Sequence, residues 1–318
     1  MLPTERKTRL GDGGNGACHN RCVSAIGIRQ YSRGMTLVEL LIALSIAGVI
    51  TGAVYQVYHS RQRSHVAQEL NLDMQQSVRA AISLMKREIR MAGYNPAGRD
   101  GVDNDDANGI DDPGESPAVG VEEAGASLIH ISFDYDGDMR KDGVAEDISY
   151  GLAKKYDGDG DGIADDGSAP LGRKSKKGAL QPLAENIQAI RFAYAFDCDD
   201  GTPDGKLDTS PNGNIIWAFD SDHDQLLDRL LDANDDGTLD AMDQSGEKDL
   251  VLRGWTGQPI PLSHIRAVRI WILARTRAPV PGHSDQRTYA VGDLVISTHD
   301  NYQRRLLSTT VYCRNMGT

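Results

Sequence analysis

The residues of this sequence best suited to chemistry are aspartates that alternate with other residues in short loops and lead into a glycine. Alternate side chains can turn toward one centre, and the glycine permits the sharp bend that a calcium loop needs. Oxygen ligands without His or Cys favour Ca²⁺ over Zn²⁺, and a set of about six to eight of them suits Ca²⁺ better than Mg²⁺. Two segments carry the full pattern and are predicted calcium sites: Asp157, Asp159, Asp161 and Asp165, and Asp232, Asn234, Asp236 and Asp240.

Two further segments carry part of the pattern. They are Asp220, Asp222, Asp224 and Asp228, which lack the glycine, and Asn104, Asp106, Asn108, Asp112 and Glu115, which end on an acid at the twelfth position. An EF-hand has its bidentate ligand at that position. No flanking helices are evident, so these loops are more similar to those of dockerins and thrombospondin type-3 repeats. The alternative is a solvated acidic loop without metal, which is our interpretation of the weaker runs at 134–138 and 197–208.

Catalytic patterns are not evident in the sequence. The histidines are scattered, and there is no G-x-S-x-G, no H-E-x-x-H and no phosphate-binding glycine loop. Lys and Arg number 34 against 46 Asp and Glu, which gives a formal net charge of −12 and leaves no basic patch for phosphates. We therefore expect neither an enzyme nor a nucleic-acid-binding protein.

The elements that must position the acidic loops begin with an apolar run from Met35 to Tyr58. As a helix its 24 residues would be roughly 36 Å long, enough to span a bilayer core of about 30 Å. Glu39 is the one charge inside this run, and a carboxylate in a membrane helix is expensive and indicates function. Three basic residues before the run favour a cytoplasmic N-terminus and a body outside the inner membrane: Arg21, Arg29 and Arg33.

The segment from Gly34 to Leu40, GMTLVEL, resembles the processing site of type IV prepilins and type II secretion pseudopilins. The resemblance implies that residues 1–34 are a leader, that prepilin peptidase cuts between Gly34 and Met35, and that Met35 is N-methylated. Met35 replaces the usual Phe. Glu39 would be the fifth mature residue, and its carboxylate would pair with the terminal amine of a neighbouring subunit. The alternatives are a plain transmembrane anchor and a secretory signal, but a signal has a shorter apolar core that precedes its cleavage site.

Cleavage would change the composition of the protein. The leader holds six basic and two acidic residues, so its removal takes the formal net charge to −16. It also removes two of the four cysteines and leaves Cys198 and Cys313. In an oxidising compartment this even pair predicts a disulfide, and two unpaired buried thiols are the alternative.

After the anchor the apolar pattern stays helical up to Gly93, without a break that would favour two separate helices. Residues at three- or four-residue spacing predict one buried face: Val66, Leu70, Met74, Val78, Ile82, Met85 and Ile89. From Pro96 onward, short β-rich runs alternate with Gly-, Asp- and Pro-rich connections and predict an antiparallel sheet. The expected strands are 128–133, 148–152, 187–196, 215–219, 265–273 and 306–312.

The predicted fold class is α+β, with one long N-terminal helix packed on an antiparallel sheet that carries acidic loop insertions. This arrangement resembles the pilin roll, and segments 185–194, 265–275 and 304–315 look like strands of PilW-type minor pilins and the related GspJ-type pseudopilins. The expected parts are the leader (1–34), the anchor half of the helix (35–60), its amphipathic half (61–95) and a β-rich body (96–318).

The resemblance implies a structural protein that is processed by prepilin peptidase, contacts other pilins, and starts assembly or sits at the tip of a type IV pilus. Calcium in the acidic loops is expected to stabilise its body. The expected location is the inner membrane with a periplasmic body, and then the pilus outside the cell. The alternatives are a GspJ-like pseudopilin of a type II secretion system and a membrane-anchored, calcium-dependent adhesin or ligand-binding module.

Overall fold

The computed structural model describes residues 34–96, 119–138, 140–141, 145–175, 178–198, 203–239, 241–244, 248–251 and 258–316. The predicted calcium segment 104–115 and the predicted ligand Asp240 lie outside the described residues. The chain divides into two compact units, Met1–Val57 and Tyr58–Thr318.

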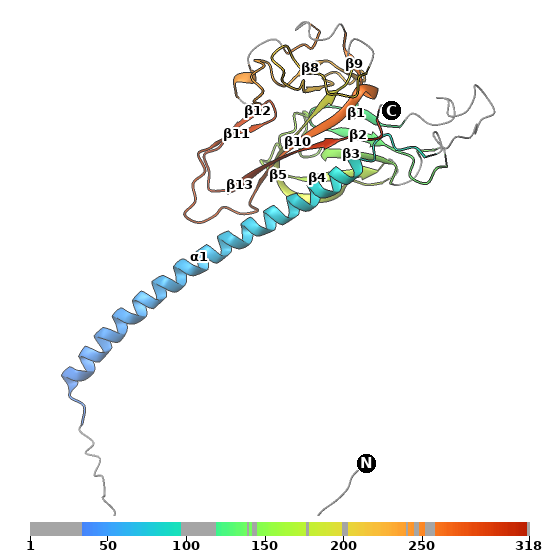
Figure 1. The fold of residues 1–318 in the computed structure, drawn as a ribbon. Helices are drawn as coiled ribbons and strands as arrows, with labels where there is room; N and C mark the ends of the chain where they lie inside the picture. The colour runs from blue at the N-terminus through green and yellow to red at the C-terminus, as the bar shows by residue number, and fades with distance from the viewer. Residues whose placement is uncertain are drawn as a thin grey trace, which may run out of the picture. The chain divides into compact units, whose positions relative to one another are not determined.

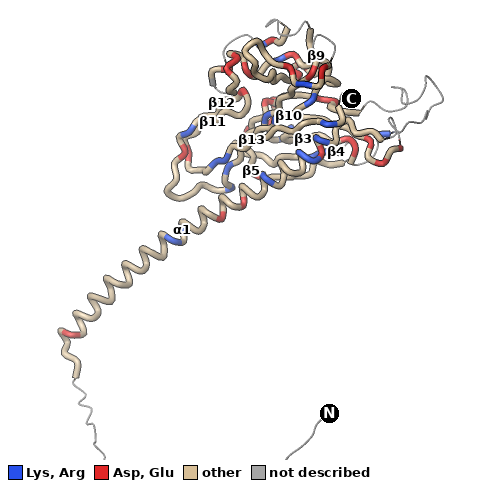
Figure 2. The backbone as a smooth tube through the Cα atoms, in the orientation of Figure 1, with Lys and Arg blue, Asp and Glu red and all other residues tan. Residues whose placement is uncertain are grey.

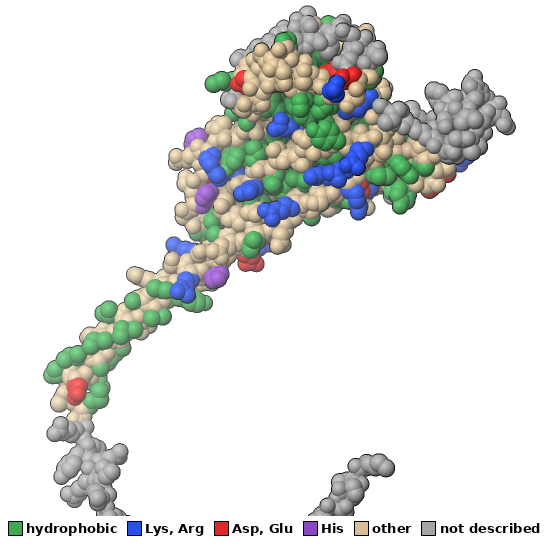
Figure 3. All heavy atoms as spheres, in the orientation of Figure 1, with side chains coloured by type: hydrophobic (Ala, Val, Ile, Leu, Met, Phe, Trp, Pro, Cys, Tyr) green, Lys and Arg blue, Asp and Glu red, His purple; other side chains and the backbone are tan. Residues whose placement is uncertain are grey.

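The helix α1 runs without interruption from Leu37 to Ile89 and contributes to both units (Figure 1). Its start is capped by Thr36, whose Oγ1 accepts a hydrogen bond from the backbone N–H of Glu39 at 3.2 Å. Glu39 lies in the first turn of α1. Figure 2 shows one acidic segment at the start of this helix followed by a long uncharged stretch, and Figure 3 shows apolar side chains along it. The most apolar part of α1 is not buried, and the helix is long and apolar enough to cross a membrane.

The second half of α1 buries one face against the body, as its spacing predicts. The buried residues are Leu70, Met74, Val78, Ala81, Met85 and Ile89. Val66 is 44% exposed, because the buried stripe begins only at Leu70. Ile82 is half-buried and Ala81 is buried in its place, since Ala81 lies closer to the middle of the whole buried stripe from Leu70 to Ile89 at about 100° per residue.

The main sheet is antiparallel in the order β1-β2-β3-β4-β5-β10-β13 (Figure 1). These strands are β1 (Val121–Ala124), β2 (Ile129–Ser132), β3 (Asp147–Leu152), β4 (Ala169–Ser175), β5 (Gln181–Phe196), β10 (Ile265–Arg275) and β13 (Arg304–Tyr312). The remaining elements are β6 (Ala218–Phe219), β7 (Leu226–Leu227), β8 (Arg229–Leu230), η3 (Ala241–Gln244), β9 (Ile260–Pro261), η4 (Leu262–His264), β11 (Thr288–Val291) and β12 (Leu294–Ser297). The predicted α+β class, a long helix on an antiparallel sheet, is therefore confirmed.

Both faces of the central strands are buried, because side chains alternate along a strand. On β10, Val268, Ile270 and Ile272 belong to the core that α1 covers. Trp271 and Leu273 belong to a second core with Trp217 and with Tyr289 and Val291 of β11. Full burial of such a large apolar side chain contributes about 1.5–3 kcal/mol. The sheet is thus a rigid middle layer, from whose strand ends the acidic loops extend.

The predicted disulfide is not formed in the structure, where the sulfurs of Cys198 and Cys313 are not bonded to each other. Cys198 follows β5 and Cys313 follows β13, and β10 lies between these two strands. Two strand spacings are about 10 Å, whereas a disulfide needs Cα atoms within about 7 Å. Burial raises the pKa of the Cys313 thiol to about 12, so this sulfur stays protonated at neutral pH. Pairing under oxidising conditions stays a prediction.

Candidate functional site

The acidic loops at 157–165, 220–228 and 232–239 share one backbone conformation. Each begins with a buried aspartate: Asp157, Asp220 or Asp232. One oxygen of that carboxylate accepts a hydrogen bond from the backbone N–H five residues later, at 3.0, 3.0 and 2.8 Å respectively. In each loop the residues three and five positions after the first aspartate have positive φ. The chain therefore turns in the same way around all three first aspartates.

The loop at 220–228 adopts this conformation without the glycine that the other two loops have. Gln225 stands where they carry Gly162 and Gly237, and its φ is 71°. His223, also with positive φ, places its Nδ1 3.2 Å from Glu123 Oε1 of β1. The missing glycine therefore does not change the conformation of this loop, and a glycine at this position is not required for it.

The loop at 157–165 brings three carboxylates together, and one of them has a buried oxygen without a hydrogen-bond partner. Asp157, Asp159 and Asp161 each place one oxygen within 4.8 Å of the others. Asp157 is 6% exposed, and its Oδ1 has no hydrogen-bond partner. Burial, and next the charge of Asp161, raise the pKa of Asp157 above its ordinary value, although the Gly162 N–H opposes this. A cation beside these carboxylates would favour their charged form and oppose this shift.

Strand β5 fixes the position of this loop. Ile163 forms a bridge with Ala189, and the carbonyl of Gly162 accepts a hydrogen bond from the Ile190 N–H at 2.9 Å. Arg191 Nη1 donates to the carbonyl of Asp161 at 3.0 Å. A Cβ at Gly162 would lie 2.4 Å from the Ile190 carbonyl oxygen, and the φ of Gly162 is +85°. Only glycine therefore fits there. The fourth predicted ligand, Asp165, accepts a hydrogen bond from the Gly158 N–H at 2.9 Å.

The loop at 220–228 also gathers carboxylates. Asp220, Asp222 and Asp224 each have an oxygen within 4.8 Å of the others. Desolvation and the charges of Asp222 and Asp220 raise the pKa of Asp224. The Asp228 carboxylate accepts hydrogen bonds from the backbone N–H of Ser221 at 2.8 Å and from the Ser221 hydroxyl at 2.6 Å. These two hydrogen bonds close the loop. Three of the four predicted ligands therefore converge, and Asp228 closes the loop.

In the loop at 232–239, Asn234 Oδ1 and Asp232 Oδ1 both accept a hydrogen bond from the Asp236 N–H, at 3.0 and 3.2 Å. Burial, and next the charge of Asp243, raise the pKa of Asp232. Asp235 has positive φ, and its Oδ1 accepts the Ser210 hydroxyl at 2.5 Å. The three described members of the predicted set thus stand on one tight turn.

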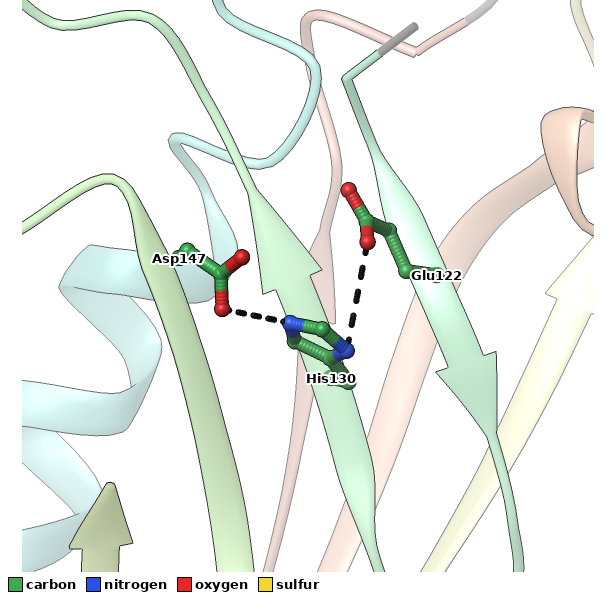
Figure 4. A group of neighbouring side chains, drawn as sticks. All are labelled: Glu122, His130 and Asp147. Atoms are coloured by element: carbon green, nitrogen blue, oxygen red, sulfur yellow. Dashed lines mark hydrogen bonds and ion pairs between the residues drawn. The ribbon is translucent and has the colours of Figure 1, made fainter. Parts of the chain in front are cut away.

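Two groups of side chains were missed by sequence reasoning. Asp134, Asp136 and Glu146 place oxygens within 4.8 Å of one another, although the run at 134–138 was interpreted as a metal-free loop. Glu122, His130 and Asp147 form the other group (Figure 4). In both groups at least one member comes from a separate segment that strand pairing brings close, and no spacing along the chain indicates that.

The predicted processing site lies at the start of the described chain. Gly34 and Met35 precede α1 in irregular structure, and both are exposed. Glu39 is exposed in its first turn. The peptide bond that the resemblance assigns to the peptidase therefore lies outside the helix.

Two family descriptions match the chain. Residues 29–55 match the prokaryotic N-terminal methylation motif, which includes Gly34, Met35 and Glu39. Residues 163–315 match Type IV Pilus-assembly protein W. The chain belongs to the type IV pilin superfamily and is most like the PilW-type minor pilins. As a pilin of this kind it is anchored in the inner membrane by the apolar start of α1 and ends up in the pilus.

Among solved structures, the chain is similar to the type IV-like pilin TTHA1219 from Thermus thermophilus. The identity is 13% and the TM-score 0.35, over 76% of this chain and 96% of that one. No curated protein matches the chain. The assignment to the pilin superfamily therefore rests on the two sequence matches.

Proposed function

We propose that this minor pilin starts the assembly of a type IV pilus or sits at its tip. The observation that carries the proposal is the N-terminal methylation motif placed on the apolar start of α1, together with the PilW match in the body. Cleavage after Gly34 creates a new amine at Met35, four residues before Glu39. A carboxylate in an apolar medium needs a partner, and the amine of a neighbouring subunit is a suitable one.

The test is the presence and the processing of this protein in native filaments. Purified pili should contain a chain that starts at N-methylated Met35, detected by mass spectrometry of the N-terminal peptide. Glu39→Ala should still be cleaved but should be poorly incorporated, because it removes the charge partner and leaves the cleavage site intact. Ser45→Ala, an exposed change in the same part of α1, is the matched control. Normal incorporation of Glu39→Ala would count against the assembly role.

The PilW match favours the pilus over a type II secretion machine, although both classes share the anchor. Deletion of the protein should reduce pilus number and leave secretion of folded enzymes unchanged. The opposite result would support the GspJ-like alternative. An adhesin role would instead leave pilus number normal and reduce only binding to surfaces.

We further propose that Ca²⁺ binds the loop at 157–165 and stabilises the body. The observation that carries this is Asp157, whose buried Oδ1 has no hydrogen-bond donor and whose carboxylate lies close to those of Asp159 and Asp161. Carboxylate oxygens are ligands that Ca²⁺ prefers. Asp157, Asp159 and Asp161 would hold the ion, with Asp165 in support. The shared backbone conformation extends the proposal to Asp220, Asp222, Asp224 and Asp228, and to Asp232, Asn234, Asp236 and Asp240. The segment at 104–115 rests on its spacing alone.

Calorimetry of the full mature protein in detergent tests the calcium proposal. A ligand that binds only the folded state at about 100 times its Kd adds about 2.7 kcal/mol of stability. Millimolar Ca²⁺ should therefore raise the melting temperature relative to chelator, and Mg²⁺ at the same concentration should raise it less. An unchanged melting temperature in calcium would contradict the proposal.

A further inference from the structure

A second kind of donor set lies on the β1–β2–β3 edge of the sheet. Glu122 comes from β1, His130 from β2 and Asp147 from β3, so three adjacent strands supply one side chain each (Figure 4). Ile129 and Ile131 flank His130 and point into the core that α1 covers. Because side chains alternate along β2, His130 faces the opposite side of the sheet.

A bulge in β1 determines the position of Glu122. The register between β1 and β2 shifts between Val121 and Glu123, which leaves Glu122 as the extra residue. Such a bulge re-aims a side chain out of the regular alternation. Glu122 can therefore face His130, while the next residue, Glu123, is the strand partner of His130.

The three side chains lie close to one another. His130 Nε2 lies 2.8 Å from Asp147 Oδ1, and His130 Nδ1 lies 4.0 Å from Glu122 Oε2. One potential ligand atom from each residue lies within 4.8 Å of the others. Two ligands of a tetrahedral Zn²⁺, at bond lengths of about 2.1 Å, stand about 3.4 Å apart. The two distances start from different nitrogens of the His130 ring, and one ion can bind only one of them. Coordination would therefore require one carboxylate to turn toward the nitrogen that binds the ion.

We propose that Glu122, His130 and Asp147 bind a divalent transition metal of the Zn²⁺ class. An imidazole with two carboxylates is a set that Zn²⁺ accepts, whereas the all-oxygen loops suit Ca²⁺. Three protein ligands leave one coordination position for water or for an external group. This proposal is independent of the calcium loops and of the role in pilus assembly.

A cavity gives access to that position. It has a volume of 710 Å³, and its lining includes Glu122 and His130 together with a second pair, Glu123 and His223. In that pair His223 Nδ1 lies 3.2 Å from Glu123 Oε1. Because His223 belongs to the loop at 220–228, the cavity is bordered by a proposed calcium loop on one side and by the β1–β2 edge on the other.

Lys141 neutralises the cluster when no metal is bound. Its Nζ lies 2.5 Å from Glu122 Oε1. A metal ion would replace the Lys141 ammonium, so Lys141 competes with the metal.

Zinc titration of the full mature protein in detergent tests the site. Calcium is kept at millimolar concentration so that the acidic loops are filled, and Zn²⁺ binding is followed by calorimetry. We expect one equivalent of Zn²⁺ that Ca²⁺ does not displace. His130→Ala should weaken binding by about tenfold or more. Glu122→Gln, which keeps the shape of the side chain, should do the same if His130→Ala fails to fold. The exposed His299→Ala is the matched control and should bind as the unaltered protein does.

Lys141→Gln separates a metal site from a merely structural ion-pair network. Removal of the competing cation should tighten Zn²⁺ binding, whereas a purely structural role predicts no gain. Co²⁺ in place of Zn²⁺ should give visible absorption bands that His130→Ala abolishes. Zinc binding that is equal in His130→Ala, Glu122→Gln and the unaltered protein, or weaker in Lys141→Gln, would overturn the proposal.

Discussion

A buried carboxylate oxygen without a hydrogen-bond donor is costly, by about 1–3 kcal/mol, unless something else compensates it. Asp157 Oδ1 is such an atom, while its other oxygen accepts the Gly162 N–H. The protein keeps this residue buried at the start of a loop that β5 holds in place. A single ion would turn this local cost into a stabilising contact.

The change Asp157→Asn should therefore have opposite effects with and without calcium. In calcium-free buffer it removes a buried charge whose pKa is raised by burial, so stability should be unchanged or slightly higher. At millimolar Ca²⁺ it removes a ligand, so the calcium-induced rise in melting temperature should shrink. Melting curves in both buffers measure this. Asp166→Asn, an exposed neighbour outside the ligand set, should retain the full rise, and an equal loss there would refute the role of Asp157.

At the scale of the elements, α1 is joined to the sheet by more than its apolar face. Glu88 near the end of α1 accepts two hydrogen bonds from Arg173 of β4, at 2.9 and 3.2 Å. The Tyr150 hydroxyl of β3 also donates to Glu88. The Glu88 and Arg173 side chains are mostly buried. This contact fixes the rotation of the helix on the sheet, which the apolar stripe alone leaves less defined.

Glu88→Gln should destabilise the body by about 3 kcal/mol, because it leaves the Arg173 guanidinium without its counter-charge in a largely buried site. Urea unfolding of the mature protein measures the loss. The double change Glu88→Gln with Arg173→Gln should recover part of it, since no lone charge then remains. Glu69→Gln, on the exposed side of α1, is the matched control and should cost little. Strictly additive losses in the double variant would contradict the contact.

The elements that sequence reasoning found are those with a clear apolar period. The spacing from Leu70 to Ile89 gave the buried face of α1, and β5, β10 and β13 stand where alternation or dense apolar runs predicted strands. Strand β4, with the sequence APLGRKS, was missed because Pro, Gly and charged residues are rare in strands. It forms because β3 and β5 pair with it on both sides.

The candidate sites also differ in whether their residues are neighbours in the sequence. The alternating aspartates were found because their geometry is local, and the structure places their carboxylates together at Asp157 and at Asp220. The cluster around His130 could not be found, because its members are joined by strand register and by one bulge. The same holds for Glu146 beside Asp134. Contacts between strands that are far apart in the sequence produce no periodic pattern of residues along the chain.

At the scale of the whole molecule, two sets of carboxylates respond to pH in opposite directions. In the loops, burial raises the pKa of Asp157 and Asp232. A raised folded pKa means that the folded state holds more protons, so stability falls as the pH rises through it. Beside β11, burial alone would raise the pKa of Asp285, but hydrogen bonds from Arg287 and Tyr289 lower it to about 2. That stability is present above the unfolded pKa and is lost as the pH falls toward about 2.

Calcium should therefore move the pH of maximum stability upward. Without calcium, repulsion within the loops favours a maximum on the acidic side of neutrality. With calcium bound, the loop carboxylates are stabilised as anions, so stability should keep rising toward neutral pH. Melting temperatures between pH 2 and 8, in calcium-free and calcium-containing buffer, measure both curves. Asp285→Asn should reduce the loss between about pH 4 and 2 in both buffers, since it removes a proton site outside the loops. Two parallel curves, with the same optimum, would show that calcium does not act through the loop carboxylates.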